Sequence, residues 1–405
     1  MSLRILFVTH DSCRTGAPLF LLNFLRWLRE FHAEIGCDLL IRQRGELDQE
    51  YMTVADKTYH WQSKSRLVEA LNAKGLVGKR RGVLDQLLRH LSSYEKKLLT
   101  RLGHEDYDLV FVNSFANARL IPLLASFLPG KPIICRAPEL ERWVEDQIGV
   151  GSVLEAIPHI DRFIAVSDLV FGYLNSGLNI PREKIIKIPG FIRKSRISMQ
   201  KPEVRHRLGV ADDAFLVCGC GTLDWRKGAD LFIQVAAEIE RRYPDREIWF
   251  CWIGGAGNLA DHRQLQFDLD MLKLSRPVLF VPSTDAFFDY LSASDLFALT
   301  SREDPFPLVA LEAASCALPI VCFDAAVGSK EFVDDRTGML VPYLDIAAFA
   351  EAIAALQEDH ERYASASDNI QALSRNYSID RICNQLLQCI LAACHPERVS
   401  LEKYS

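Results

Sequence analysis

Two acidic residues stand out in the segment TSREDPFPLVALEAASCALPIVCFD, which begins at Thr300. Asp304 precedes a proline-rich turn, and Glu312 lies eight residues later among leucines and alanines whose spacing predicts a buried helix. A carboxylate in such a helix is unfavourable unless a hydrogen-bonding partner replaces its lost hydration. A helix that ran through both residues would place the carboxylates on about the same face, roughly 12 Å apart. Two carboxylates so arranged could hold opposite ends of one extended polar ligand.

Pro307 predicts where this helix begins, because its fixed φ suits the first helical turn, where its missing N–H is not needed. The backbone N–H groups of Phe306, Leu308 and Val309 would then be placed to meet an oxygen or phosphate. Asp304, just before that start, also suits an ordinary N-cap or helix-dipole contact. The sequence leaves both uses of Asp304 open.

A second group of candidate residues lies in GCGTLDWRKGADLF, where a strand that ends in glycines is followed by a helix. Arg226 and Lys227 stand at this strand-to-helix turn, where cations can bind a phosphate, and Gly228 would allow close backbone approach. A Lys-Gly pair alone is more often a solvated turn. Gly16 opens the first predicted helix in HDSCRTGAP, where a glycine loop could approach phosphates from the other side of a cleft.

We expect neither a metal nor a cofactor. The eleven cysteines are scattered without a CxxC pair and are typical of small buried hydrophobic residues. The acidic triplet Asp268–Asp270 lies in a stretch of helical pattern and is more typical of a solvated helix face than of a metal motif. The segment WIGGAGN, with Gly254 and Gly255, lacks the GxGxxG spacing of a dinucleotide-binding turn.

The elements that must position these residues alternate between short apolar runs and amphipathic stretches of helical length, which predicts βα units and parallel sheets. One series of expected strands covers 4–9, 108–113, 132–136 and 162–167, and a second covers 215–220, 248–255, 277–282, 295–300 and 319–323. A polar segment at 193–206 between them is interpreted as a linker. At 405 residues the chain is long enough for two domains, so we expect two doubly wound α/β domains with the ligand at the carboxyl ends of the strands.

Composition narrows the function classes. The net charge of -6 gives no reason to expect a nucleic-acid partner. The N-terminal apolar run is too short for a signal peptide, and no stretch is long enough to span a bilayer, so we expect a cytoplasmic protein.

One basic segment, 74–101, could lie on the inner face of the membrane. It combines cations such as Lys79, Arg80 and Arg81 with an apolar face that includes Leu84 and Leu91, a pattern of helices that bind anionic lipid. An ordinary domain helix with its apolar face in the core explains the same pattern.

Several ordered motifs together resemble a known family. The pattern Asp304…Glu312, followed by LEAASCALPIVCFD and GSKEFVDDRTGMLVP, the Lys227-Gly228 turn, the first loop around Gly16 and the segment 161–192 are similar to retaining nucleotide-sugar glycosyltransferases of family four. The resemblance covers nearly the whole chain. It implies the GT-B fold: an N-terminal Rossmann-like acceptor-binding domain at 1–195, a C-terminal Rossmann-like donor-binding domain at 206–375, and a helix and tail at 376–405 that cross back to the first domain.

The resemblance also implies roles for residues, with Lys227, Asp304 and Glu312 as the catalytic residues. Glu312 would hydrogen-bond the donor ribose, Asp304 the sugar, and Lys227 the pyrophosphate. The remaining implied donor contacts are Gly16, Thr222, Arg226, Gly254, Gly255, Phe306, Pro307, Leu308 and Val309.

The chain departs from the family pattern at several positions. Asp304 stands where glutamate is usual, and Thr222 where a phosphate-binding arginine is common, which leaves Arg226 to replace that arginine. Arg136 and Pro138 stand where relatives often have histidine, which leaves Glu139, with Arg136, as the acceptor-side candidates.

The implied function is transfer of a sugar from a nucleotide-sugar, a UDP- or GDP-sugar, to a glycan or lipid-linked glycan, with retention of anomeric configuration and without a metal. Polysaccharide or glycoconjugate biosynthesis is the implied setting. The alternatives are a non-catalytic glycosyltransferase-like scaffold, suggested by Thr222, Arg136 and Pro138, and an NAD-dependent oxidoreductase, which would need the absent GxGxxG turn.

Overall fold

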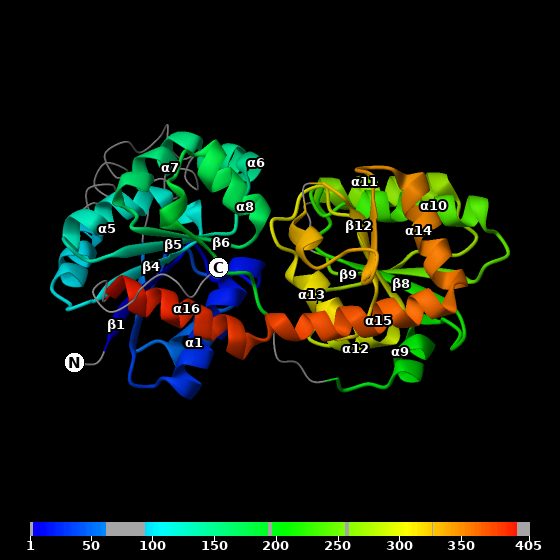
Figure 1. The fold of residues 1–405 in the computed structure, drawn as a ribbon, viewed down its shortest axis with the longest axis horizontal. Coiled ribbons are helices and arrows are strands. Elements are labelled where there is room, and N and C mark those ends of the chain that lie inside the picture. Colours follow the sequence, from blue (N-terminus) through cyan, green and yellow to red (C-terminus); the bar gives the residue numbers. More distant parts are fainter. Residues whose placement is uncertain (1–2, 62–93, 193–196, 256–258, 326, 395–405) are drawn as a thin grey trace, which may run out of the picture. The chain divides into compact units, whose positions relative to one another are not determined.

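The computed structural model describes residues 3–61, 94–192, 197–255, 259–325 and 327–394 (Figure 1). These residues form two compact units. The first comprises the chain up to Val166, Val170–Ile188 and the segment from Cys383 onward, and the second comprises Ser167–Leu169 and Pro189–Ile382. Each unit is built around its own parallel sheet.

The first unit contains a seven-stranded sheet in the order β3-β2-β1-β4-β5-β6-β7. Its strands are β1 Arg4–Thr9, β2 Gly36–Ile41, β3 Lys57–His60, β4 Leu109–Asn113, β5 Ile133–Ala137, β6 Arg162–Ala165 and β7 Ile185–Lys187. All neighbouring pairs are parallel. The order reverses between β1 and β4, so the loops after these strands diverge and leave room for a ligand at the carboxyl edge.

Helices cover both faces of this sheet (Figure 1). They are α1 Gly16–Phe31, α2 Asp48–Val54, a helix at 94–103, α5 Ile121–Phe127, α6 Glu141–Trp143, α7 Val150–Ala156 and α8 Asp168–Gly172. Helix α1 is amphipathic, and its apolar face is buried against the sheet, with the ring of Phe24 6.1 Å from that of Phe7. The last helix of the chain, α16 Ile379–Cys394, belongs to this unit from Cys383 onward.

The second unit contains a six-stranded parallel sheet in the order β10-β9-β8-β11-β12-β13. Its strands are β8 Phe215–Cys220, β9 Ile248–Ile253, β10 Leu279–Val281, β11 Leu296–Leu299, β12 Ile320–Phe323 and β13 Gly338–Val341. The order reverses between β8 and β11. The loops that follow these two strands carry most of the candidate residues.

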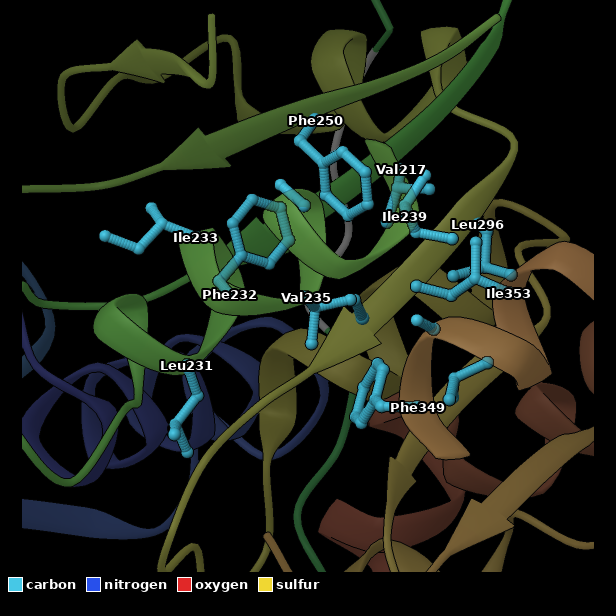
Figure 2. Packing of buried hydrophobic residues seen from close by; sticks show 14 of the residues in the cluster. Val217, Leu231, Phe232, Ile233, Val235, Ile239, Phe250, Leu296, Phe349 and Ile353 are labelled. Carbon is cyan, nitrogen blue, oxygen red and sulfur yellow. The ribbon is translucent and has the colours of Figure 1, made fainter. Parts of the chain in front are cut away.

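The helices of the second unit are α9 Lys201–Leu208, α10 Ala229–Arg242, α11 Leu259–Leu272, α12 Phe287–Ala293, α13 Leu308–Ser315, α14 Ile346–Glu358 and α15 His360–Ser374. Helices α10 and α14 pack together, as do α9 with α12 and α13 with α15. Figure 2 shows the core under α10 and α14, where the ring of Phe232 lies 5.3 Å from that of Phe250. This core fixes the start of α10, and with it the WRKG turn.

The expected class of fold is confirmed, and every strand of the two predicted series is present. The segment that we interpreted as a linker instead contains most of α9. The reason is Arg205, which is buried and anchors the helix by donating from Nε to Ala293 O (2.9 Å) and from Nη2 to Asp295 Oδ2 (2.5 Å). A polar sequence can therefore form a packed helix when one buried cation is hydrogen-bonded to acceptors of the domain.

Candidate functional site

Two loops meet at the carboxyl edge of the sheet in the second unit. We call residues 221–228, after β8, the WRKG loop, and residues 300–307, after β11, the acidic loop. Arg302 N donates to Arg226 O (2.8 Å), and Arg226 Nη1 donates back to Glu303 O (3.2 Å). The loops are thus joined main chain to main chain as well as by side chains.

The end of the WRKG loop approaches the acidic loop very closely. Thr300 Oγ1 donates to Gly228 O (2.8 Å), and a Cβ atom added to Gly228 would lie 2.1 Å from Thr300 O. Gly228 also has a φ of 70°, which side chains other than glycine rarely adopt. The Lys-Gly turn is therefore required by the packing of the two loops, whatever it binds.

Lys227 and Asp304 form an ion pair between the loops. Lys227 Nζ lies 2.5 Å from Asp304 Oδ2, although the residues are 77 positions apart. The side chains are 16% and 6% exposed, so the pair is only partly reachable by water. The structure thus brings together two of the three residues to which the sequence assigned catalysis.

Asp304 is neither an N-cap nor part of the helix. Helix α13 begins at Leu308 with Pro307 as its N-cap, and no side chain caps it. Asp304 instead forms an isolated parallel bridge with Val327, and its carbonyl accepts from Gly328 N (2.8 Å). Asp304 thus lies just before the helix, as its position before Pro307 predicted. The spacing of a helix that ran through both Asp304 and Glu312 does not apply, because main-chain pairing holds Asp304 outside the helix.

The start of α13 presents backbone donors near this ion pair. The first N–H groups of the helix to donate to a main-chain carbonyl are those of Ala310 and Leu311, which both donate to Pro307 O. The N–H groups of Leu308 and Val309 belong to the first turn, whose donors have no acceptor within a helix. They lie where we expected donors for a ligand oxygen.

Phe306 contributes to the packing of the same turn. Its ring lies 5.8 Å from that of Phe332 and 5.9 Å from that of Tyr377, and its side chain is buried. The side chain thus anchors the turn, which leaves only the main chain of Phe306 for a ligand.

Glu312 lies in the middle of α13 and is 1% exposed. Its neighbours from Ala310 to Ala314 are all buried, so the middle of α13 has no solvated face, whereas Leu308 and Val309 at the start of the helix are half-buried. The sequence correctly placed this carboxylate in an apolar helix. Burial of an acid so deep in a domain is unfavourable in free energy, which is typical of a residue kept for function.

The remaining predicted donor residues surround the WRKG loop. Thr222 Oγ1 donates to Asp224 Oδ2 (2.5 Å), and Asp224 Oδ1 accepts from Lys227 N (2.8 Å). Gly254 follows β9, and its N–H donates to Val281 O (2.8 Å), while the adjacent Gly255 has no atom within 4 Å of an added Cβ. Asp224, which organises the loop, was not singled out from the sequence.

A second residue missed by sequence reasoning is Arg302. Its guanidinium donates to both carboxylate oxygens of Asp230 (2.8 and 2.6 Å) and to Trp225 O (2.7 Å). It also lies 5.0 Å from the centre of the Trp225 ring. One side chain thus fastens the acidic loop to the WRKG loop and to the first turn of α10.

The first unit has its own buried polar cluster at the carboxyl ends of β4 and β5. The guanidinium of Arg136 lies 3.8 Å from the centre of the Phe20 ring and donates to Asn113 Oδ1 (3.4 Å), while its Nε has no hydrogen-bond partner among the described residues. Glu139 accepts hydrogen bonds from Ser114 Oγ and from Phe115 N.

Burial raises the pKa of Glu139 to about 7 and lowers that of Arg136 to about 10. Glu139 can therefore carry or release a proton near neutrality. Gly16 lies at the same edge: the next residue, Ala17, accepts at its carbonyl from Asn113 Nδ2 (2.8 Å). The predicted acceptor-side residues are thus buried next to the first turn of α1, whose Gly16 is exposed.

Two further expectations concern helices. Asp268 and Asp270 are exposed on α11, as expected for a solvated face, and the described residues contain no group of three or more His, Cys, Asp or Glu that could hold a metal ion. Of the basic segment 74–101, residues 74–93 lie outside the described residues. In the described helix at 94–103, Leu98 is buried and Lys96, Lys97 and Arg101 are exposed. No described helix is long and apolar enough to cross a membrane.

Comparison with known proteins agrees with this geometry. Residues 214–359, which include both loops and α13, match the family model described as Glycosyl transferases group 1. The chain is 35% identical over 153 residues to an alpha-galactosylglucosyldiacylglycerol synthase of Streptococcus pneumoniae, with coverage of 36% of this chain and 39% of the relative. It is 28% identical over 233 residues to the lipopolysaccharide core biosynthesis mannosyltransferase LpsB of Rhizobium meliloti, with coverage of 56% and 64%. The chain thus spans less than two thirds of the length of either relative.

Solved structures extend the similarity of fold to both units. HepE of Anabaena, solved in complex with UDP and glucose, aligns with a TM-score of 0.75 at 21% identity and covers 96% of this chain and 100% of its own. WaaG, described as a glycosyltransferase involved in lipopolysaccharide biosynthesis, aligns with a TM-score of 0.68 at 13% identity, with coverage of 95% and 99%. Residues 214–359 therefore form a glycosyl transferases group 1 domain, in a chain that has the two-domain GT-B fold of solved glycosyltransferases.

Proposed function

We propose that this chain is a glycosyltransferase that takes a nucleotide-sugar and passes its sugar to an acceptor glycan. One observation carries the proposal. Within the group 1 domain, Lys227 is held by Asp304 at the carboxyl edge of the sheet, shortly before the start of α13. A cation next to free helix amides is the arrangement that stabilises a leaving diphosphate.

The donor would bind along the two loops. Lys227, with Arg226 nearby on the same loop, would face the diphosphate, and the amides of Phe306, Leu308 and Val309 would meet sugar or phosphate oxygens. Glu312 would accept from the ribose hydroxyls in charge-assisted hydrogen bonds. The remainder of the donor site would be lined by Thr222, Gly254 and Gly255.

Retention of anomeric configuration and independence from a metal are part of the proposal. Lys227 and the α13 amides would supply the positive charge that a metal supplies elsewhere. With the leaving diphosphate held in this way, the acceptor would attack from the face that the diphosphate leaves, and the departing phosphate would receive the acceptor's proton. Arg136 and Glu139 in the first unit would serve the acceptor side.

A lipid-linked acceptor is supported by one relative, which is named for a diacylglycerol glycolipid. Contact of the segment 74–101 with the inner face of a membrane would bring the enzyme to such an acceptor. Sedimentation with anionic vesicles at low and high salt tests the contact. No co-sedimentation at low salt, or binding that survives replacement of Lys79, Arg80 and Arg81 by glutamate, would favour a soluble acceptor.

The function is tested by a panel of UDP-, GDP- and ADP-sugars. A donor that binds the folded state raises its apparent stability, so one member should raise the melting temperature and then be turned over, by transfer or by hydrolysis. Stabilisation without turnover at any enzyme concentration would favour the scaffold alternative. A panel in which no member stabilises the protein would contradict the proposal.

A further inference from the structure

In the ion pair between Lys227 and Asp304, the lysine is bound to a carboxylate, although the same ammonium group would bind the diphosphate of the donor. Lys227 Nζ lies 2.5 Å from Asp304 Oδ2. A diphosphate oxygen bound to the same ammonium group would lie within about 5 Å of that carboxylate, where two negative charges repel strongly in a partly buried site. A diphosphate and Asp304 therefore compete for Lys227.

The pair is built into the loops and is not a chance surface contact. The aliphatic part of Lys227 runs along Gly221, where an added Cβ would lie 2.9 Å from Lys227 Cγ. Lys227 N is held by Asp224 Oδ1 (2.8 Å). On the other side, Asp304 is fixed through its main chain to Val327 and Gly328. Only the ends of the two side chains are left to rearrange.

We propose that Asp304 holds Lys227 when no donor is bound and opposes the binding of nucleotides that carry no sugar. The inference rests on the proposed function. An intact donor would draw Lys227 to its diphosphate and offer Asp304 a sugar hydroxyl in exchange. After transfer that hydroxyl has gone, so Asp304 returns to Lys227 and helps to expel the nucleoside diphosphate. Asp304 would thus act in product release as well as in sugar binding.

Binding of UDP, GDP and ADP to the purified full chain, measured by calorimetry, tests this inference. The proteins compared are the wild type, Asp304→Asn, Lys227→Gln and the double variant. Removal of the competing charge should tighten binding of the cognate nucleotide by roughly fivefold or more, the scale of a typical coupling between sites. In the Lys227→Gln background, the same change should alter affinity by less than about twofold, because the competition is for Lys227.

Two controls make the outcome specific. Asp268→Asn removes the same charge from the exposed face of α11 and should leave nucleotide affinity unchanged. Asp304→Ser provides a second neutral variant if Asp304→Asn does not fold. Weaker or unchanged nucleotide binding in the neutral variants, or equal tightening with and without Lys227, would overturn the inference.

Failure of the inference can be told apart from failure of the function. If the wild type transfers sugar but Asp304→Asn binds nucleotide no more tightly than the wild type, only the product-release role of Asp304 is contradicted. If neither the wild type nor Asp304→Asn binds any of the three nucleotides, and the wild type turns over no nucleotide-sugar, the proposed function fails and the inference fails with it.

Discussion

Arg302 donates hydrogen bonds to both carboxylate oxygens of Asp230, at 2.8 and 2.6 Å, although the two residues are 72 positions apart in the sequence. Asp230 lies in the first turn of α10, and Arg302 lies in the acidic loop just before Asp304. The guanidinium also donates to Trp225 O. The pair therefore sets the position of the acidic loop relative to Lys227 without itself touching the ion pair.

We predict that Arg302→Lys slows sugar transfer while the protein stays folded. Lysine keeps the charge but loses the planar fork that binds two oxygens at once. A loss of about tenfold in kcat is expected, because small displacements of a reacting group reduce rates steeply. Steady-state kinetics measures the loss, and Arg241→Lys, an exposed arginine on α10, is the matched control. Unaltered kcat in Arg302→Lys would show that the two loops keep their positions without the fork.

Glu312→Gln should weaken binding of the donor. The neutral amide keeps the shape of the buried side chain but replaces charge-assisted hydrogen bonds to the ribose with neutral ones. The expected loss is about 1.5–3 kcal/mol of binding free energy, measured by titration with the stabilising nucleotide-sugar. Glu351→Gln, on the exposed side of α14, should bind normally. Wild-type affinity in Glu312→Gln would remove the ribose role.

Glu139 should make stability depend on pH. Its pKa in the folded protein is about 7, raised from 4.5 by burial. Because the pKa is higher in the folded state than in the unfolded state, this group stabilises the folded state. The stabilisation is fully present when the pH is below the pKa of the unfolded state, and it is lost as the pH rises to about 7. Over that window the wild type should lose about 2–3 kcal/mol of unfolding free energy through this group.

Glu139→Gln should remove this dependence, because the amide does not titrate. Urea unfolding of both proteins at pH 5 and pH 8 gives the comparison, with Glu155→Gln, an exposed position on α7, as the control. Relative to the wild type, Glu139→Gln should have a higher free energy of unfolding at pH 8 than at pH 5. An equal gap at both pH values would mean that Glu139 is ionised throughout this range.

Helix α16 should stabilise the first unit. Its residues Cys383, Leu386 and Ile390 are fully buried, and the segment from Cys383 belongs to that unit. Leu386→Ala removes buried apolar volume and should lower the unfolding free energy by about 2–5 kcal/mol. Limited proteolysis should then cut the first unit sooner than in Gln388→Ala, whose side chain is exposed. Equal resistance in the two variants would mean that α16 is dispensable for this unit.

Much of the fold could be predicted because the central strands are continuous apolar runs, as in β1 and β8, and each is followed by an amphipathic helix. Four strands, β2, β3, β7 and β13, lie outside the two predicted series, and three of them have a clear physical reason. β2 contains Asp38, which is buried only because Arg4 and Tyr107 bind its carboxylate. β3 is a short polar edge strand, and β13 follows a turn with few apolar residues.

The site could be predicted only in part. Residue type and local spacing pointed to Lys227, Asp304 and Glu312, but not to the contact between Lys227 and Asp304, because that contact depends on how β8 and β11 pair in the sheet. Arg302 and Asp224 act only through such tertiary contacts. The local sequence gives no signal for Arg302, because its carboxylate partner Asp230 lies 72 positions away.

The central claim is that Lys227 stabilises a departing nucleoside diphosphate. The most direct test compares the rate of donor cleavage by Lys227→Ala with that of the wild-type enzyme. Both enzymes are given the same donor and acceptor, at saturating and at limiting concentrations. The account predicts that kcat falls by a larger factor than KM rises, since the cation matters most as negative charge develops on the leaving group. An unchanged kcat with only a higher KM would contradict it and leave Lys227 as a residue that merely binds the donor.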